Sequence, residues 1–245
     1  MSDQARHDST PPMVDHFDLH GRRAVVLGAD GPAGAAIAAA FAAAGADLAL
    51  LPATSAGSQA AAEVRRAARG LDGLDILVCA LDAFEAQPFL ATDAAMLARV
   101  MASNFTLVFE ALQGAAAEML AADAVNGRRG NLIVVTHALG SRGLPNAAAY
   151  CAAHGAIANL IHALAQELAP TGISVNGIAL GWMDWMTDRL DPADEDARRA
   201  IRFTLSKRAG RPDDVGALAL WLAGSGVGYV TGQVFPLDGG LTQHL

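Results

Sequence analysis

The sequence predicts a single α/β domain built on a doubly wound parallel sheet. Short runs that are almost continuously apolar alternate with longer helical stretches through most of the chain. Such continuously apolar runs are typical of strands in a parallel sheet that helices cover on both faces. The chain has 245 residues, of which 53% are hydrophobic, so it is long enough for one large domain with a sizeable core. We see neither a linker nor an internal repeat.

The first part of the chain predicts two strands joined by a helix. Residues 24–28 are an apolar run that ends in glycine, and residues 47–51 form the next apolar run. The alanine-rich stretch 34–45 between them ends in glycine, as helices commonly do. About twenty residues then separate Leu51 from Leu74, roughly half of what a crossover helix, a third strand and another helix need. We therefore expect the third, edge strand to be missing.

The remaining elements follow from the same pattern. Four later apolar runs predict buried strands: 75–78, 131–136, 174–180 and 233–237. Helices are expected in the intervals, over 94–122, 150–169 and 213–223. The stretch 188–202 alternates acidic residues with arginine and predicts a solvated lid helix. Residues 1–14 lack a signal pattern and predict a flexible leader, which leaves 15–245 as the domain.

Charge and cysteine content exclude several classes of function. The 17 basic and 25 acidic residues give a net charge of -8, which repels nucleic acids and anionic membrane surfaces. We therefore expect neither as a partner. Cys79 and Cys151 are the only cysteines, too few for a disulfide framework or a four-thiolate zinc site. The sequence thus predicts a cytoplasmic protein without a metal site.

Several motifs, most of them in the C-terminal half, carry a family resemblance. One group begins at Tyr150 with YCAAHGA and continues as LAQELA and GISVN. The other comprises GRPDDV at 210–215, VTGQ at 230–233 and DGG at 238–240. Together they resemble the short-chain dehydrogenase/reductase family, and the resemblance covers about residues 19–240. It implies a Rossmann-like fold and, in typical members, a nicotinamide cofactor.

The expected cofactor loop departs from the family's pattern. That pattern is T-G-x-x-x-G-x-G, whose glycines let the backbone approach the pyrophosphate at a helix N-terminus. Here residues 27–34 read LGADGPAG. Gly28 and Gly34 match, but Pro32 replaces the middle glycine, which removes an N–H and adds ring atoms. Asp30 adds a negative charge. We expect a vestigial loop that persists as a tight strand-to-helix turn.

Other positions that the resemblance assigns to the cofactor also differ. Residues 52–54 supply neither the acidic residue nor the arginine that would bind the adenosine ribose. Asp82 stands where the family's N-N-A-G motif has glycine. Trp185 occupies or adjoins the position of a threonine that binds the nicotinamide amide. We therefore expect that this chain binds no cofactor, and that NAD is bound by a partner subunit.

The resemblance implies a catalytic set of serine, tyrosine, lysine and asparagine. The tyrosine acts as acid or base, and the lysine's charge lowers its pKa. Tyr150 matches the tyrosine and Asn104 the asparagine, but His137 stands at the serine position and His154 at the lysine position. A histidine is mostly neutral at pH 7 and so activates a tyrosine weakly. The catalytic set is therefore degenerate.

Intact framework motifs beside altered functional motifs indicate a degenerate subunit. The chain is similar in this to the non-catalytic subunit of the heteromeric dehydrogenase of the benzylsuccinate pathway of toluene breakdown. The resemblance implies an active paralogue as partner, acting on a hydroxy or hydroxyacyl-CoA substrate. It also implies a heterotetramer that pairs through the helices around 94–122 and 150–169.

Two alternatives stay open at this point. The first is a cofactor-independent lyase, dehydratase or dehalogenase that uses Tyr150 with His137 or His154, since histidine titrates near neutral pH. The second is an atypical NAD(P)-dependent oxidoreductase.

Overall fold

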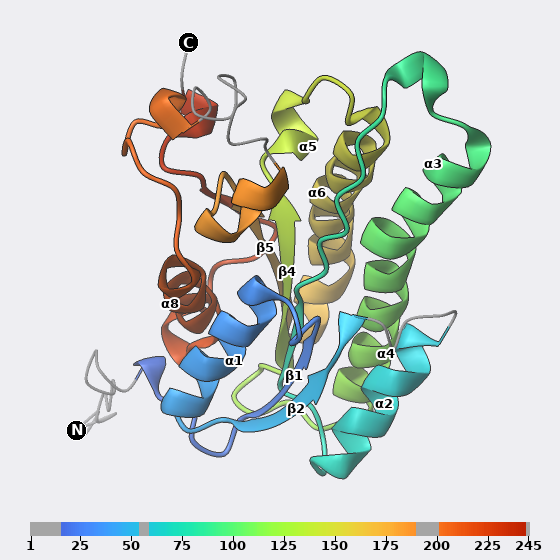
Figure 1. Ribbon diagram of the computed structural model, residues 1–245. Helices are drawn as coiled ribbons and strands as arrows, with labels where there is room; N and C mark the ends of the chain where they lie inside the picture. Colours follow the sequence, from blue (N-terminus) through green and yellow to red (C-terminus); the bar gives the residue numbers. More distant parts are fainter. Residues whose placement is uncertain (1–15, 54–58, 190–200, 244–245) are drawn as a thin grey trace, which may run out of the picture.

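Six parallel strands form one sheet with the order β2-β1-β3-β4-β5-β6 in the computed structural model (Figure 1). The structure describes residues 16–53, 59–189 and 201–243. The strands are β1 (Arg23–Leu27), β2 (Asp47–Leu51), β3 (Ile76–Cys79), β4 (Gly130–His137), β5 (Ile173–Leu180) and β6 (Val234–Leu237). The predicted leader 1–14 lies outside the described residues, as does most of the predicted lid helix 188–202.

Helices cover both faces of the sheet, as the sequence predicts. One face carries α1 (Pro32–Ala43) and α8 (Pro212–Ala223), and the other carries α2 (Ala60–Gly70), α4 (Leu107–Ala121) and α6 (Ala148–Leu168) (Figure 1). Side chains of a strand alternate between the two faces. Thus Ala24 and Val26 contribute to the core under α1 and α8, whereas Val25 and Leu27 contribute to the other core. Two shorter helices are α3 (Ala94–Met101) and α5 (Leu139–Arg142).

The sheet ends at β2, which confirms the prediction that the third strand is missing. Between β2 and β3 the described residues contain α2 and no strand. The segment between β2 and β3 is long enough for one crossover helix, which is the shortest usual connection between parallel strands. Leu50 on β2 is 54% exposed at this edge.

The predicted helix 94–122 differs from the structure in its middle. A π-helical turn, Ala102–Thr106, separates α3 from α4. Asn104 within this turn donates from Nδ2 to the carbonyl oxygens of Val100 and Ala83, at 3.0 and 2.9 Å. Its Oδ1 also accepts a hydrogen bond of 2.9 Å from the Ala83 N–H. The side chain thus joins the loop after β3 to the helix at the point where the regular α-helical ladder is interrupted.

Small residues allow the helices on each face to pack closely. A Cβ atom on Gly114 of α4 would lie 2.6 Å from the carbonyl oxygen of Ala61 in α2. A Cβ atom on Gly216 of α8 would lie 3.0 Å from the carbonyl oxygen of Ala36 in α1. Both contacts exclude a larger side chain without movement of a helix backbone.

Two helical stretches, Ala94–Ala121 and Ala148–Thr171, are long and apolar enough to cross a membrane by length and composition. This is weak evidence, because core helices of soluble proteins meet the same criterion. Here α4 contacts α2, β3 and β4, and α6 contacts β4 and β5.

An ion pair joins β1 to the residue before β3 at the amino edge of the sheet. The Asp75 carboxylate accepts hydrogen bonds from the backbone N–H of Arg23 at 2.9 Å, and from its Nε and Nη2 at 2.8 and 3.1 Å. Burial raises the pKa of Asp75, but the hydrogen bonds and charge of Arg23 outweigh it, so this pKa lies below its ordinary value of 3.8. The ionised pair therefore stabilises the fold.

We predict that Asp75→Asn lowers the free energy of unfolding by about 1–3 kcal/mol near neutral pH, because hydrogen bonds to a charged group contribute about this much. The pKa of Asp75 is lower in the folded than in the unfolded state. Its contribution is therefore complete above about pH 4 and is lost as the pH falls through the folded-state pKa. Urea unfolding of both proteins across this range is the measurement. A difference that stays constant down to the lowest pH would contradict the prediction.

Candidate functional site

Four residues that the sequence singles out lie together beyond the carboxyl ends of β3 and β4. We call Tyr150, His137, His154 and Asp82 the tyrosine–histidine cluster. The Tyr150 ring centroid lies 4.3 Å from that of His154 and 5.8 Å from that of His137, and the two histidine rings are 6.1 Å apart. The exposed fractions are 0% for Tyr150, 4% for His137 and 2% for His154. The three rings therefore form part of the interior.

The Tyr150 hydroxyl donates a hydrogen bond of 2.5 Å to Oδ1 of Asp82. Asp82 lies in the loop after β3, whereas Tyr150 lies in the first turn of α6. The ring of Phe84 packs edge-on against Tyr150, with centroids 5.0 Å apart. The hydroxyl is thus held as a donor toward a carboxylate.

The two histidines have separate partners in the backbone and in β4. Nδ1 of His154 forms a hydrogen bond of 2.9 Å with Oγ1 of Thr136. Nδ1 of His137 accepts a hydrogen bond of 3.1 Å from the backbone N–H of Leu139, at the start of α5. This hydrogen bond fixes the orientation of the His137 ring against the start of α5. Sequence reasoning missed Thr136 because it depends on how α6 packs on β4.

Asn104 lies at the edge of this region and is 1% exposed. Both of its N–H groups donate to backbone oxygens, those of Val100 and Ala83. This arrangement positions the loop that carries Asp82, which directly precedes Ala83. Asn104 therefore helps to position Asp82 through its hydrogen bonds to the backbone of Ala83.

The glycines of the loop after β1 are required by close packing. Gly28 has a φ of +86°, and a Cβ atom there would lie 2.3 Å from the carbonyl oxygen of Ala80. A Cβ atom on Gly34 would lie 2.1 Å from the carbonyl oxygen of Gly28. The turn therefore needs glycine at both positions whether or not a nucleotide binds. Pro32 begins α1, a favourable position for proline, but it removes one of the N–H groups that could bind an anion.

Asp30 connects this loop to the residues after β2. Its Oδ1 accepts a hydrogen bond of 2.7 Å from the backbone N–H of Ala53. The family resemblance places the ribose-binding residue of a dinucleotide enzyme in the segment after β2. In this chain, a carboxylate from the first loop lies against that segment. The negative charge is unfavourable for a neighbouring phosphate.

Bulky apolar side chains fill the region after β5. Trp182, Met183 and Met186 are buried, and the half-buried Trp185 packs against the core under α1 and α8. The Trp182 and His137 ring centroids are 6.2 Å apart, with edge-on geometry. Trp185 thus occupies volume in the core, in keeping with its indole chemistry.

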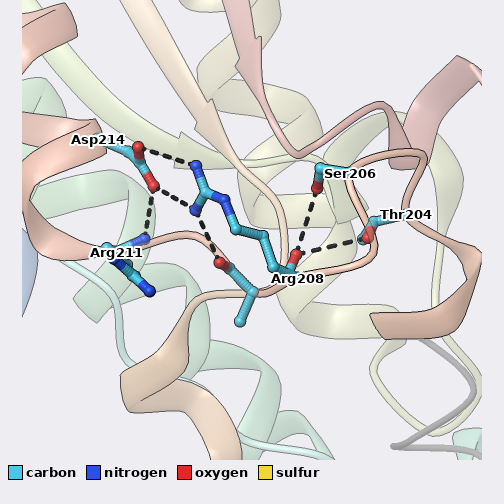
Figure 2. Close-up of polar contacts among 6 residues, drawn as sticks. Thr204, Ser206, Arg208, Arg211 and Asp214 are labelled. Atoms are coloured by element: carbon cyan, nitrogen blue, oxygen red, sulfur yellow. Dashed lines mark hydrogen bonds and ion pairs between the residues drawn. The ribbon is translucent and has the colours of Figure 1, made fainter.

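Polar contacts join residues of the segment from Thr204 to Asp214 (Figure 2). Part of this segment lines a small hollow. Arg208 donates from Nη1 and Nη2 to the two carboxylate oxygens of Asp214, at 2.8 and 3.2 Å. The hollow has a volume of about 160 Å³, and Arg208 and Asp214 are the charged residues among those that line it. The hydrogen bond from Arg208 lowers the pKa of Asp214. The two charges therefore compensate each other.

The described residues contain no group of three or more His, Cys, Asp or Glu side chains placed to hold a metal ion. Cys79 on β3 is fully buried, and burial raises the pKa of its thiol to about 12. It is therefore protonated and packs as a small core residue.

Comparison with known proteins places these features in a family. The sequence pattern of the enoyl-(acyl carrier protein) reductase family matches residues 57–242. Nodulation protein G from Rhizobium sp. is 31% identical over 248 residues, which cover 92% of this chain and 98% of that protein. The inactive 2-(S)-hydroxypropyl-CoM dehydrogenase 2 of Xanthobacter autotrophicus is 35% identical over 151 residues, which cover 59% of this chain and 63% of that protein's length.

Solved structures give the same result. A short-chain type dehydrogenase/reductase from Mycobacterium marinum superposes with a TM-score of 0.83 at 28% identity, over 94% of this chain and 98% of that one. A gluconate 5-dehydrogenase from Burkholderia cenocepacia, solved with NADP and tartrate, has a TM-score of 0.82 at 26% identity, over 95% and 99% of the two chains. The family pattern, the relatives and the fold agree. The chain belongs to the short-chain dehydrogenase/reductase family.

Proposed function

We propose that this chain is a catalytically degenerate subunit that supports a partner dehydrogenase in a cytoplasmic hetero-oligomer. The observation that carries the proposal is the state of Tyr150. This residue, which the family uses as acid or base, is 0% exposed and donates its hydroxyl to Asp82. A general acid or base must reach the proton that it transfers. A tyrosine held in the interior against a carboxylate is suited to stabilising the fold.

The cofactor positions support the same proposal. The conserved nicotinamide chemistry of the family requires a dinucleotide at the loop after β1. Here Pro32 lacks an N–H, the Asp30 carboxylate accepts a hydrogen bond from the Ala53 N–H, and the half-buried Trp185 packs against the core. These residues do not fit a bound dinucleotide. Under the proposal, NAD is bound by the active partner subunit.

The names of two relatives support a hydroxy substrate. The Xanthobacter protein is named as an inactive 2-(S)-hydroxypropyl-CoM dehydrogenase, and a second relative from the same organism, 34% identical over 156 residues, as a 2-(S)-hydroxypropyl-CoM dehydrogenase. Both names contain a 2-(S)-hydroxypropyl-CoM compound, which carries a hydroxy group. For the partner of this chain we propose a hydroxy substrate, with hydroxyacyl-CoA thioesters as the first class to test.

The outer surface of α3, α4 and α6 is the surface that we propose for pairing with the partner. Leu97, Phe109 and Leu120 are 45%, 37% and 44% exposed on α3 and α4. The outward positions of α6 include the small residues Ala152 and Ala163. Small and apolar side chains let helices of two subunits approach closely. We propose a heterotetramer assembled through these helices.

A cofactor-independent lyase, dehydratase or dehalogenase is the second candidate. The observation that favours it is the short distance between the rings of Tyr150 and His154, with centroids 4.3 Å apart. A phenol and an imidazole at this separation could divide acid and base roles. Tyr150→Phe separates the two candidates.

We predict that Tyr150→Phe lowers the free energy of unfolding by about 1–3 kcal/mol, because the Asp82 carboxylate loses a buried donor. Urea unfolding is the measurement. Tyr229→Phe is the matched control, because Tyr229 is fully exposed, and we expect it to change stability by less than about 0.5 kcal/mol. Unchanged stability together with loss of a nicotinamide-independent turnover would support the lyase instead.

We predict that the chain, tagged in its native host, co-purifies with a short-chain dehydrogenase that has intact glycine, tyrosine and lysine motifs. Adding this chain to the purified partner should raise the partner's turnover of hydroxyacyl-CoA. Phe109→Glu should abolish co-purification, because it places a charge in the proposed interface. Leu50→Glu is the matched control, since Leu50 is an exposed apolar residue on β2. A purely homomeric preparation would contradict the proposal.

A further inference from the structure

A short segment before α8, residues 204–210, contacts the chain beyond the carboxyl ends of β5 and β6. We call this segment the strap. The Ser206 N–H donates to the carbonyl oxygen of Gly239, which follows β6, at 3.0 Å. The Gly210 N–H donates to the carbonyl oxygen of Trp182, which follows β5, at 2.8 Å. The strap is thus hydrogen-bonded to the segments that follow two neighbouring strands.

Gly210 connects the strap to the tyrosine–histidine cluster through the segment that carries Trp182. The Gly210 carbonyl oxygen accepts a hydrogen bond of 2.9 Å from the Asp184 N–H, so Gly210 pairs in parallel with Met183. A Cβ atom on Gly210 would lie 2.5 Å from the sulfur of Met183. Trp182 is 8% exposed, and its ring packs edge-on against His137, with centroids 6.2 Å apart. The strap therefore helps to hold Trp182 against the cluster.

The ion pair of Arg208 with Asp214 brackets Gly210 in the sequence. Arg208 donates to both carboxylate oxygens of Asp214 (Figure 2). Asp214 lies in the first turn of α8, where it also accepts a hydrogen bond of 2.8 Å from the Arg211 N–H. Paired hydrogen bonds between a guanidinium and a carboxylate fix orientation as well as distance. The ion pair thus fastens to α8 the short loop that presents Gly210.

The strap is also organised within itself. The hydroxyl groups of Thr204 and Ser206 each donate to the carbonyl oxygen of Arg208 at 3.4 Å (Figure 2). Arg208 donates in turn from Nη1 to the carbonyl oxygen of Ala209 at 3.0 Å. These contacts join the residues of the strap to one another, so the strap can move as one unit.

Polar contacts contribute more to holding the strap than apolar burial does. Thr204 is buried, but Leu205 is 58% exposed, and Ser206, Lys207 and Arg208 are exposed as well. The strap and the ion pair line the hollow of about 160 Å³, so this side of the strap borders a space rather than packed core. Segments with few buried apolar contacts open locally at a low cost in free energy.

We propose that the strap opens and closes as a unit, that the Arg208–Asp214 ion pair is its latch, and that opening releases Trp182 from the tyrosine–histidine cluster. The structure holds the closed state. When the latch breaks, Gly210 can separate from Met183, and the segment of Trp182 loses the two hydrogen bonds that join it to Gly210. The latch thereby controls access to the cluster from the carboxyl edge of the sheet. Opening needs no second subunit, so this device is independent of the proposed function.

Hydrogen exchange of the purified full-length chain, followed by mass spectrometry, tests the latch. Arg208→Gln removes the ion pair and leaves the Asp214 carboxylate to cap α8. We expect the amides of Ser206, Gly210 and Asp184 to exchange about three- to fivefold faster than in the wild type, the range that an exposed ion pair can supply. Wild-type exchange rates at these amides would overturn the proposal.

Arg99→Gln is the matched control for the loss of an exposed ion pair. Arg99 donates to both carboxylate oxygens of Glu85, at 2.9 and 3.4 Å, and the two side chains are 61% and 38% exposed, against 52% and 32% for Arg208 and Asp214. Strap exchange in this variant should stay within about twofold of the wild type. If Arg208→Gln also accelerates exchange throughout β4, Arg208→Lys decides the question. It keeps the charge without the paired geometry, and wild-type strap exchange in it would overturn the proposal.

Chemical modification of His137 tests whether opening of the strap releases Trp182. Diethyl pyrocarbonate modifies accessible histidine rings, and peptide mapping gives the rate for each histidine. In Arg208→Gln we expect His137 to react about three- to fivefold faster, by the same factor as strap exchange. His162 is exposed on α6 and serves as the internal reference, because its rate should stay within about twofold. Faster strap exchange with an unchanged rate at His137 would overturn the link between the strap and the cluster.

Discussion

The parallel pairing of β1, β3 and β4 determines which loops and helices of this chain meet. Parallel strands all end at one edge of the sheet, so the segments that follow them meet there. Asp82 arrives at that edge after β3, and Tyr150 arrives in the first turn of α6. Their hydrogen bond of 2.5 Å joins the two segments. The same pairing brings the residues before the strands to the opposite edge, where Arg23 binds Asp75.

Residues that the fold needs and residues that the family's chemistry needs are separate in this chain. Gly28 and Gly34 match the family pattern. The fold itself requires both glycines, because a Cβ atom at either position would clash with a neighbouring backbone oxygen. Pro32 and Asp82 depart from the pattern at positions where such packing makes no demand for glycine. The result is a framework of the short-chain dehydrogenase/reductase type, and we propose that its loop after β1 persists as a packed turn. Membership of the fold family therefore does not by itself imply the family's activity, which depends on the residues of the site.

Much of the framework could be predicted from the sequence, because buried parallel strands are continuously apolar. The predicted run 24–28 corresponds to β1 (Arg23–Leu27), and the short spacing before β3 indicated the missing edge strand. The partners within the site could not be predicted in this way. Tyr150 and Asp82 are 68 positions apart, and their hydrogen bond depends on how α6 packs on the sheet. The π-helical turn carries Asn104, whose hydrogen-bond partner Ala83 lies in a loop that precedes the helix.

We propose that this chain does not bind the nicotinamide dinucleotide of its family. The decisive measurement is calorimetric titration of the folded, purified chain with NAD, NADH, NADP and NADPH. We expect no saturable binding of any of the four, with the folded state verified by circular dichroism. Binding in the micromolar range, about -8 kcal/mol, would overturn the proposal and return the chain to the active dehydrogenases.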